Sequence, residues 1–278
     1  MSGSVAQPPR GGPRVVALGG GHGLAASLSA LRQVTPHLTA VVTVADDGGS
    51  SGRLRDELGV LPPGDLRMAL AALAGSDEWG RTWEALLQHR FAGAGPLAGH
   101  AVGNLVLAGL TGSTGDAVRA LDLTAQLVGA VGRVLPMSCV PLEIVAEVIG
   151  ADPRNPMGFR EVVGQVAVAT TAGQVAALSL RPVDPPACAE SVEAVRRADW
   201  VVLGPGSWFT SVLPHLLVPG LRRALVQTPA RRLVCLNLSE QPQASGAPTA
   251  PDERSEILEI RATTPEGVSV VRTAILPL

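Results

Sequence analysis

The 278-residue chain contains no lysine and no tyrosine, and only 3% of its residues are aromatic. Its 22 basic and 24 acidic side chains nearly balance, which gives no electrostatic case for binding nucleic acid. No apolar run reaches the roughly 18 residues that a membrane helix needs. Hydrophobic residues nevertheless make up 46% of the chain, a share that excludes a disordered protein and is ordinary for a globular one.

Cysteine is also scarce. Cys139, Cys188 and Cys235 are odd in number, lie far apart, and form no Cys-x-x-Cys pair. A disulfide framework is therefore disfavoured, and a reducing compartment fits better. Residues 1–13 hold Gly, Pro and Ser without an apolar stretch, which indicates a flexible tail and not a signal peptide. We expect a cytoplasmic protein.

The pattern of apolar residues predicts a single α/β domain over residues 14–278. A buried strand at 14–18, a glycine turn, a helix at 22–34 and a second strand at 38–44 form a βαβ unit with parallel strands. Further strands are expected at 133–135, 143–149, 200–203, 233–238, 257–261 and 268–274, and further helices at 66–73, 78–90, 100–110, 115–128 and 187–197.

Two stretches are expected to depart from this alternation. Residues 46–67 hold Gly, Ser, Pro and Asp in a pattern that predicts a long loop at the carboxyl end of the second strand. Residues 164–170 and 174–180 alternate around a short turn and predict a β-hairpin. The hairpin would belong to a small antiparallel insertion at about 140–182.

The first candidate site is the glycine loop after the first strand, which contains Gly20, Gly21, His22 and Gly23. Such a loop turns sharply and directs the N–H groups of the following helix at a ligand, of which phosphate is the natural example. Leu24 stands where a dinucleotide fingerprint has its third glycine, and no lysine follows as in a P-loop. A tight turn without a ligand is an equal alternative.

The second candidate site follows the second strand. Asp46 or Asp47 would accept hydrogen bonds from a ribose, or the pair would hold a divalent metal. The donors of Gly49, Ser50 and Ser51 beside Arg53 suit a diphosphate or a sugar. The alternatives are a solvated or flexible loop and helix capping.

Two more groups of polar residues occur at predicted helix starts. Asp65 suits an N-cap, whereas Arg67 opposes the helix dipole there and indicates an anion nearby. His100 and Asn104 would share one helix face, either towards a ligand or as a buried hydrogen-bonded pair.

A second glycine turn follows the strand at 200–203. It contains Gly204, Pro205, Gly206 and Ser207 and precedes a helix expected to start near Ser207. It would face the first glycine loop at the carboxyl edge of the sheet. Trp208 and His215, further along, fit packing roles.

The motifs VALGGGHGL, TVADDGGSSGRLRDELGVLPPGDLR, AGHAVGNL and GPGSWFTSVLPHLL occur in this order. Together they resemble the YvcK family, the gluconeogenesis factors, within the CofD-like superfamily. The resemblance covers residues 15–238. It implies a three-layer, Rossmann-like, mostly parallel sheet with helices on both faces and a nucleotide site at its carboxyl edge.

The resemblance also implies a function. YvcK-like proteins are cytoplasmic, bind UDP-sugars such as UDP-N-acetylglucosamine or UDP-glucose, and are linked to cell shape, peptidoglycan synthesis and gluconeogenic growth. Partners among cell-wall synthesis proteins and association with further copies of the chain would accord with this. The alternative is a CofD-type transferase, which moves a phospholactyl group from an activated nucleotide to a deazaflavin alcohol with a divalent metal. The sequence does not decide whether a reaction follows binding, and a dinucleotide-dependent oxidoreductase has only the Rossmann-like start in its favour.

One segment departs from the family pattern. The family continues after Gln241-Pro242 with a Gly-Glu-Thr-Asp-Gly stretch and a helix, which Gln243-Ala244-Ser245-Gly246 replaces here. We therefore expect any ligand or subunit contact of that segment to differ from the family pattern.

Overall fold

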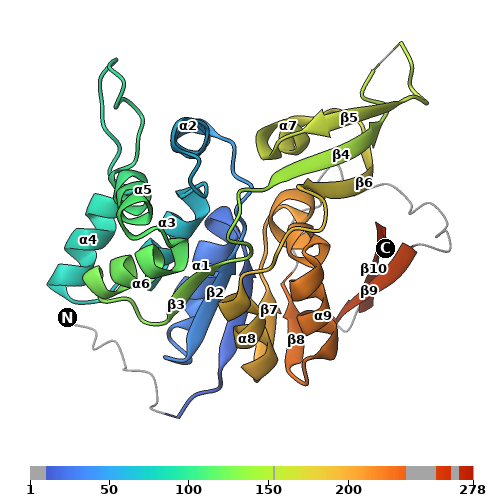
Figure 1. Ribbon diagram of the computed structural model, residues 1–278. Helices are drawn as coiled ribbons and strands as arrows, with labels where there is room; N and C mark the ends of the chain where they lie inside the picture. Colours follow the sequence, from blue (N-terminus) through green and yellow to red (C-terminus); the bar gives the residue numbers. More distant parts are fainter. Residues whose placement is uncertain (1–10, 153, 236–254, 264–268, 278) are drawn as a thin grey trace.

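The computed structural model describes residues 11–152 and 154–235, together with the backbone of residues 255–263 and 269–277. Its centre is a five-stranded parallel sheet in the order β3-β2-β1-β7-β8 (Figure 1). The predicted strands are confirmed as β1 (Val15–Gly19), β2 (Leu38–Val42), β3 (Arg133–Pro136), β7 (Trp200–Leu203) and β8 (Arg231–Val234). The predicted strand residues 236–238, the tail before residue 11 and the segment after Gln241-Pro242 up to residue 254 lie outside the described residues.

The order of the strands fixes where a ligand site belongs. β1 is buried along its whole length and pairs with β2 on one side and β7 on the other. The chain therefore builds outward from β1 to β3 and later resumes on the opposite side of β1. The topological switch point therefore lies between β1 and β7, and open α/β sheets bind ligands at the carboxyl edge of such a point.

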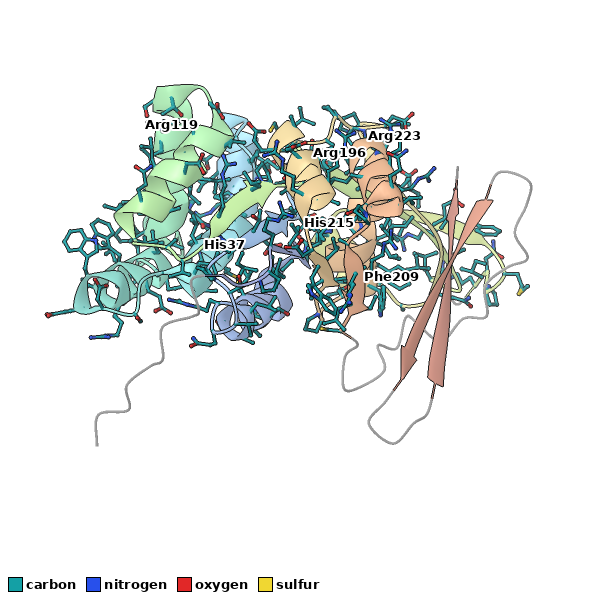
Figure 2. The ribbon with its side chains drawn as sticks, turned by 90° about the horizontal axis from the view of Figure 1, so that it is seen from below. His37, Arg119, Arg196, Phe209, His215 and Arg223 are labelled. Atoms are coloured by element: carbon teal, nitrogen blue, oxygen red, sulfur yellow. The ribbon has the colours of Figure 1, made fainter. Side chains whose placement is uncertain are left out.

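Helices cover both faces of the sheet, with α1 on one side and α8 and α9 on the other (Figure 2). The predicted α/β fold is thereby confirmed. None of the helices in the described part of the chain is long and apolar enough to cross a membrane. The helices outside the insertion are α1 (Gly21–Leu31), α2 (Gly49–Leu58), α3 (Gly64–Leu73), α4 (Glu78–Gln88), α5 (Val102–Thr114), α6 (Ala117–Leu127), α8 (Ala189–Arg197) and α9 (Pro219–Gln227).

The predicted long loop at residues 46–67 is wrong for most of its length, because α2 occupies residues 49–58. Gly48 and Gly49 at the start of the motif favour the prediction of a loop. The Arg-Leu-Arg-Asp-Glu-Leu run that ends the motif, however, consists mainly of good helix formers. The helix stops at Gly59, whose left-handed φ of 65° is a common helix end. The motif is therefore a helix N-terminus and not an open loop.

A second, antiparallel sheet forms the predicted insertion, in the order β5-β4-β6. Its strands are β4 (Glu143–Ile149), β5 (Phe159–Val163) and β6 (Gln174–Arg181). The predicted hairpin at 164–180 is wrong, because its first half is α7 (Gln165–Thr170). The N–H of Val166 donates to the carboxylate of Asp47 at 3.0 Å, a long-range contact that starts the helix and that a local pattern does not reveal.

The chain closes with two antiparallel strands, β9 (Ser255–Thr263) and β10 (Ser269–Pro277), which confirm and extend the predicted ones. The helix expected near Ser207 begins as the π-helical turn η1 (Trp208–Val212) and continues as the 3-10 helix η2 (Leu213–Leu217). Pro214 lacks the N–H that a regular α-helix needs at this point.

His215 of η2 is fully buried in the core, which confirms its packing role. Its Nε2 lies 3.0 Å from the carbonyl oxygen of Val41 in β2, and Figure 2 shows it close to the sheet. Burial lowers the pKa of His215 to about 4, so the imidazole is neutral at neutral pH.

Candidate functional site

The loops after β1 and β7 touch at the carboxyl edge of the sheet. The first helical residue, Gly21, has a φ of 57°. A Cβ at Gly23 would lie 2.0 Å from the carbonyl oxygen of Pro205. Gly206 has a φ of 138°, so neither loop tolerates side chains at these positions. The structure thus brings together two glycine turns that lie far apart in the sequence, with His22 exposed and Ser207 half-buried beside them.

A buried carboxylate supports the first glycine loop from below. Asp65 Oδ2 accepts a hydrogen bond from Thr43 Oγ1 at 2.9 Å, and the carboxylate also accepts one from the N–H of Gly21. A Cβ at Gly20 would lie 2.5 Å from the same Oδ2. Asp65 therefore fixes the loop that starts α1. The predicted N-cap role is wrong, because the N-cap position of α3 is Pro63 and Asp65 lies inside the helix.

The environment of Asp65 is costly for a negative charge. Burial raises its pKa to about 6, and the nearby carboxylate of Asp46 adds to the effect. The hydrogen bonds from Thr43 and Gly21 oppose the shift only in part. A carboxylate that titrates close to neutral pH at the edge of a sheet is typical of a functional site.

A hydrogen-bonded chain of four side chains crosses the floor of the site. Arg67 Nε donates to Asn104 Oδ1 at 2.9 Å, and Asn104 Nδ2 donates to Ser50 Oγ at 2.9 Å. Ser50 Oγ in turn lies 2.9 Å from His100 Nδ1. All four residues are buried, and they come from α2, α3, α5 and the segment before α5.

These hydrogen bonds show which of the predicted site residues pair with one another. His100 does not share a helix face with Asn104, since α5 begins only at Val102, but both meet at Ser50. Burial lowers the pKa of Arg67 to about 10, and the positive charge of the nearby Arg90 adds to the effect. The Arg67 guanidinium is still charged at neutral pH. Burial, aided by Arg53, lowers the pKa of His100 and favours the neutral imidazole.

The two adjacent aspartates point to different partners. Asp46 Oδ1 accepts the N–H of Gly48 at 2.9 Å, while Asp47 Oδ1 accepts that of Val166 in the insertion. They do not present both carboxylates to one ion. Over the described ranges, no three His, Cys, Asp or Glu side chains gather as a metal site would require. Asp46 remains half-buried beside the N-terminus of α2 and faces the Asp65 side of the site.

The start of α2 is packed as tightly as the glycine loops. A Cβ at Gly64 would lie 2.4 Å from Ser51 Oγ and 2.5 Å from Asp46 Oδ2. Ser51 is buried, whereas Gly49 is exposed with a φ of 45°. The α2 N-terminus is therefore pressed against that of α3, and the helix dipoles of both add positive potential to this edge.

Arg53 has protein partners of its own. Its Nη1 donates to the carbonyl oxygen of Pro96 at 3.1 Å and its Nη2 to that of Ala98 at 2.8 Å. Both carbonyls belong to the exposed loop between α4 and α5, which projects beside α2 in Figure 1. Arg53 thus holds this loop against the site, a contact that the sequence did not indicate.

An Arg53→Ala variant is therefore expected to loosen the loop, because two hydrogen bonds from a cation are lost. Chymotrypsin cleavage at the exposed Leu97 should become several-fold faster, as followed by mass spectrometry. Arg55→Ala is the matched control, since Arg55 bonds to Leu142 and Glu143 on the other side of α2. Equal cleavage rates in the two variants would contradict the role given to Arg53.

Sequence reasoning missed Thr43, the buried hydroxyl that bonds Asp65. A signal was present, because Thr43 is one of two polar residues in the apolar run LTAVVTV and stands at its carboxyl end. Gly64 was also missed, although it precedes Asp65 in the Pro-Pro-Gly-Asp motif.

The opposite edge of the sheet carries shallow hollows lined by arginines, among them Arg14, Arg133 and Arg197. Each of these guanidinium groups pairs with a carboxylate, on Asp199, Asp122 and Glu193 respectively. Their charges are already compensated there. The carboxyl edge, with its glycine loops and helix N-termini, is therefore the better candidate for an anionic ligand.

The parallel sheet with two glycine turns at its switch point places this chain among the doubly wound α/β proteins, whose usual ligand site is the carboxyl edge of the sheet. Comparison with known sequences narrows this class. The chain belongs to the CofD family, whose profile, described as 2-phospho-L-lactate transferase CofD, matches residues 15–271.

Within that family the chain is similar to gluconeogenesis factors, in agreement with the YvcK resemblance. It is 60% identical to a putative gluconeogenesis factor of Mycobacterium leprae over 84% of this chain and 65% of that protein. It is 37% identical to the gluconeogenesis factor of Bacillus subtilis over 86% of this chain and 72% of that protein. The chain thus spans about two thirds of the length of the mycobacterial relative.

A solved structure supports the fold. The crystal structure of a Bacillus halodurans protein aligns with a TM-score of 0.72 and 41% sequence identity, over 81% of this chain and 68% of that one.

Proposed function

We propose that the protein is a cytoplasmic UDP-sugar-binding regulator, which supports cell shape and peptidoglycan synthesis during growth on gluconeogenic carbon sources. The observation that carries this proposal is the direct contact of the two glycine turns at the carboxyl edge of the sheet. Similarity to proteins named gluconeogenesis factors favours a regulatory role over a metabolic reaction. We propose UDP-N-acetylglucosamine or UDP-glucose as the ligand.

In this proposal the first turn of α1 and the Gly204–Ser207 turn bind the diphosphate through main-chain N–H groups. Asp46 accepts hydrogen bonds from the ribose hydroxyls. The buried chain from Arg67 to His100 fixes the floor of the site, and the cation of Arg67 offsets part of the negative charge above it. Preorganised buried polar groups lower the cost of ordering the site when the ligand binds.

Calorimetric titration with UDP-N-acetylglucosamine, UDP-glucose, UDP, GDP and NAD, each with and without magnesium, tests the proposal. We expect selective binding of a UDP-sugar that stays intact. Asp46→Asn should weaken this binding about tenfold, the effect of losing one charge-assisted hydrogen bond. Asp56→Asn is the control, because Asp56 is an exposed aspartate in α2, which follows Asp46. Binding of none of these nucleotides, or equal affinity in the two variants, would count against the site.

The second candidate function is a CofD-type transferase, which the description of the family profile favours. Such an enzyme needs a divalent metal at the phosphate. The diverging carboxylates of Asp46 and Asp47 do not fit a two-carboxylate metal site. Turnover of an activated nucleotide with magnesium and a deazaflavin alcohol would establish this function, and binding without turnover would exclude it.

A further inference from the structure

Cys139 and Cys188 lie together although 48 residues separate them in the sequence. Cys139 is in the segment from β3 to β4, and Cys188 is the N-cap residue of α8. The two segments run side by side, since the N–H of Cys188 donates to the carbonyl oxygen of Met137 at 3.1 Å. Cys139 is two residues from Met137, so this backbone bond brings the two cysteines together, and each thiol shifts the pKa of the other.

These two segments are the neck of the antiparallel insertion. The chain leaves the parallel sheet after β3, forms β4, β5, α7 and β6, and returns at α8. The cysteines therefore lie across the neck. The insertion in turn contacts the candidate site, because Asp47 bonds to Val166 at the start of α7.

We propose that Cys139 and Cys188 form a reversible disulfide that closes the neck of the insertion. Cys139 is exposed and gives an oxidant access, while Cys188 is buried directly beside it as the second sulfur. Both thiols are free in the structure, which is the reduced form. The bond needs no movement of distant elements, because the main chain of Cys188 is already hydrogen-bonded to Met137, two residues from Cys139.

The surroundings of Cys188 favour its thiolate. The hydrogen bond from Cys139 lowers the pKa of the Cys188 thiol, and the N–H of Ser191 in the first turn of α8 assists, whereas burial acts against both. The pKa of Cys139 is raised by the same hydrogen bond and by burial. The Cys188 thiol also donates a hydrogen bond to the carboxylate of Glu190 at 3.2 Å, which acts against the lowering of its pKa.

Hydrogen peroxide is a sufficient oxidant. One thiol is oxidised to a sulfenic acid with release of water, and the second sulfur then attacks it, forms the S–S bond and releases a second water. Two thiols and one peroxide thus give one disulfide and two waters. A dithiol reverses the reaction by thiol-disulfide exchange and becomes a disulfide itself.

The 278-residue protein is treated with a small excess of hydrogen peroxide, alkylated in denaturant and digested with trypsin. We expect peptide 134–154 to be linked to peptide 161–196, with loss of two hydrogens, and dithiothreitol to separate them. Cys235 is the internal control and should remain fully alkylated. Because the bond closes a long loop, oxidation should raise the melting temperature by about 5–10 °C.

Cys139→Ser supplies the matched variant, because its exposed side chain can change without disturbing the core. Peroxide should leave the melting temperature of this variant unchanged. Sulfinic acid at Cys139 without a linked peptide, a bond to Cys235, or disulfide-linked dimers in place of the internal bond would each overturn the proposal. None of these readouts depends on a UDP-sugar, so the outcome is independent of the proposed function.

Discussion

Replacement of Asp65 by asparagine is expected to stabilise the protein at neutral pH. Asparagine keeps an oxygen that can accept hydrogen bonds from Thr43 and Gly21, but it carries no charge to bury. The folded-state pKa of about 6 lies above the ordinary value of 3.8. Since each pKa unit corresponds to about 1.4 kcal/mol, the ionised carboxylate destabilises the folded protein by about 3 kcal/mol.

The sign of this effect depends on pH. Because the pKa of Asp65 is raised in the folded protein, the protonated side chain stabilises the fold fully below the unfolded-state pKa of 3.8. This stabilisation is lost as the pH rises through about 6. The free energy of unfolding of the Asp65→Asn variant should therefore exceed that of the parent protein by about 3 kcal/mol at pH 7.5 and by little at pH 4. Urea unfolding at both pH values measures the difference. A constant difference would show that ionisation of Asp65 is not its cause.

The buried His215 does not disturb this comparison. Its lowered pKa has the opposite effect, because acidification then destabilises the folded protein. Between about pH 6.5 and 4, His215 is protonated in the unfolded chain but stays neutral in the folded protein. This loss of stability on acidification is the same in both proteins. It cancels in the difference, although it flattens the pH profile of each protein taken alone.

Gly23→Ala is expected to separate the two glycine turns. Its Cβ would meet the carbonyl oxygen of Pro205 at 2.0 Å, and a main-chain atom cannot rotate away as a flexible side chain can. We expect a loss of about 3 kcal/mol in the free energy of unfolding, the upper part of the range for overpacking. UDP-sugar affinity should fall at the same time, because the two turns no longer form one surface.

The matched control is Gly109→Ala on the exposed face of α5, where an added Cβ meets nothing within 4 Å. There alanine should raise stability by about 0.5–1 kcal/mol, since it restricts the unfolded chain and favours the helix. Urea unfolding of the two variants measures both effects. Similar stability of both would mean that the contact between Gly23 and Pro205 relaxes at little cost.

The parallel sheet could be predicted from the sequence because its strands are buried on both faces and read as continuous apolar runs, such as 38–44 and 200–203. The structure of the antiparallel insertion was harder to predict. Residues 165–170 alternate like a strand but form a helix, whose first turn is bonded to Asp47, more than a hundred residues away in the sequence. The helix at 49–58 was hidden by the glycines and serines at its start.

The candidate site, too, could be predicted from the sequence only in part. Its glycines and acidic residues were recognisable because a strand followed by glycines has a known geometry. The partners of each side chain were not. Asp46 and Asp47 are neighbours in sequence but bond to different elements, and Arg53 binds a protein loop. Such pairings depend on packing between distant segments, which a sequence motif does not show.

The position of β1 in the sheet has a consequence for synthesis on the ribosome. β1 pairs with β2 soon after both emerge, but its other partner, β7, follows about 185 residues after Val15. At 5–20 residues per second, one edge of this fully buried strand stays unpaired for roughly ten to forty seconds. The nascent chain must survive that interval with an open β edge, the kind of surface that chaperones protect and other chains join.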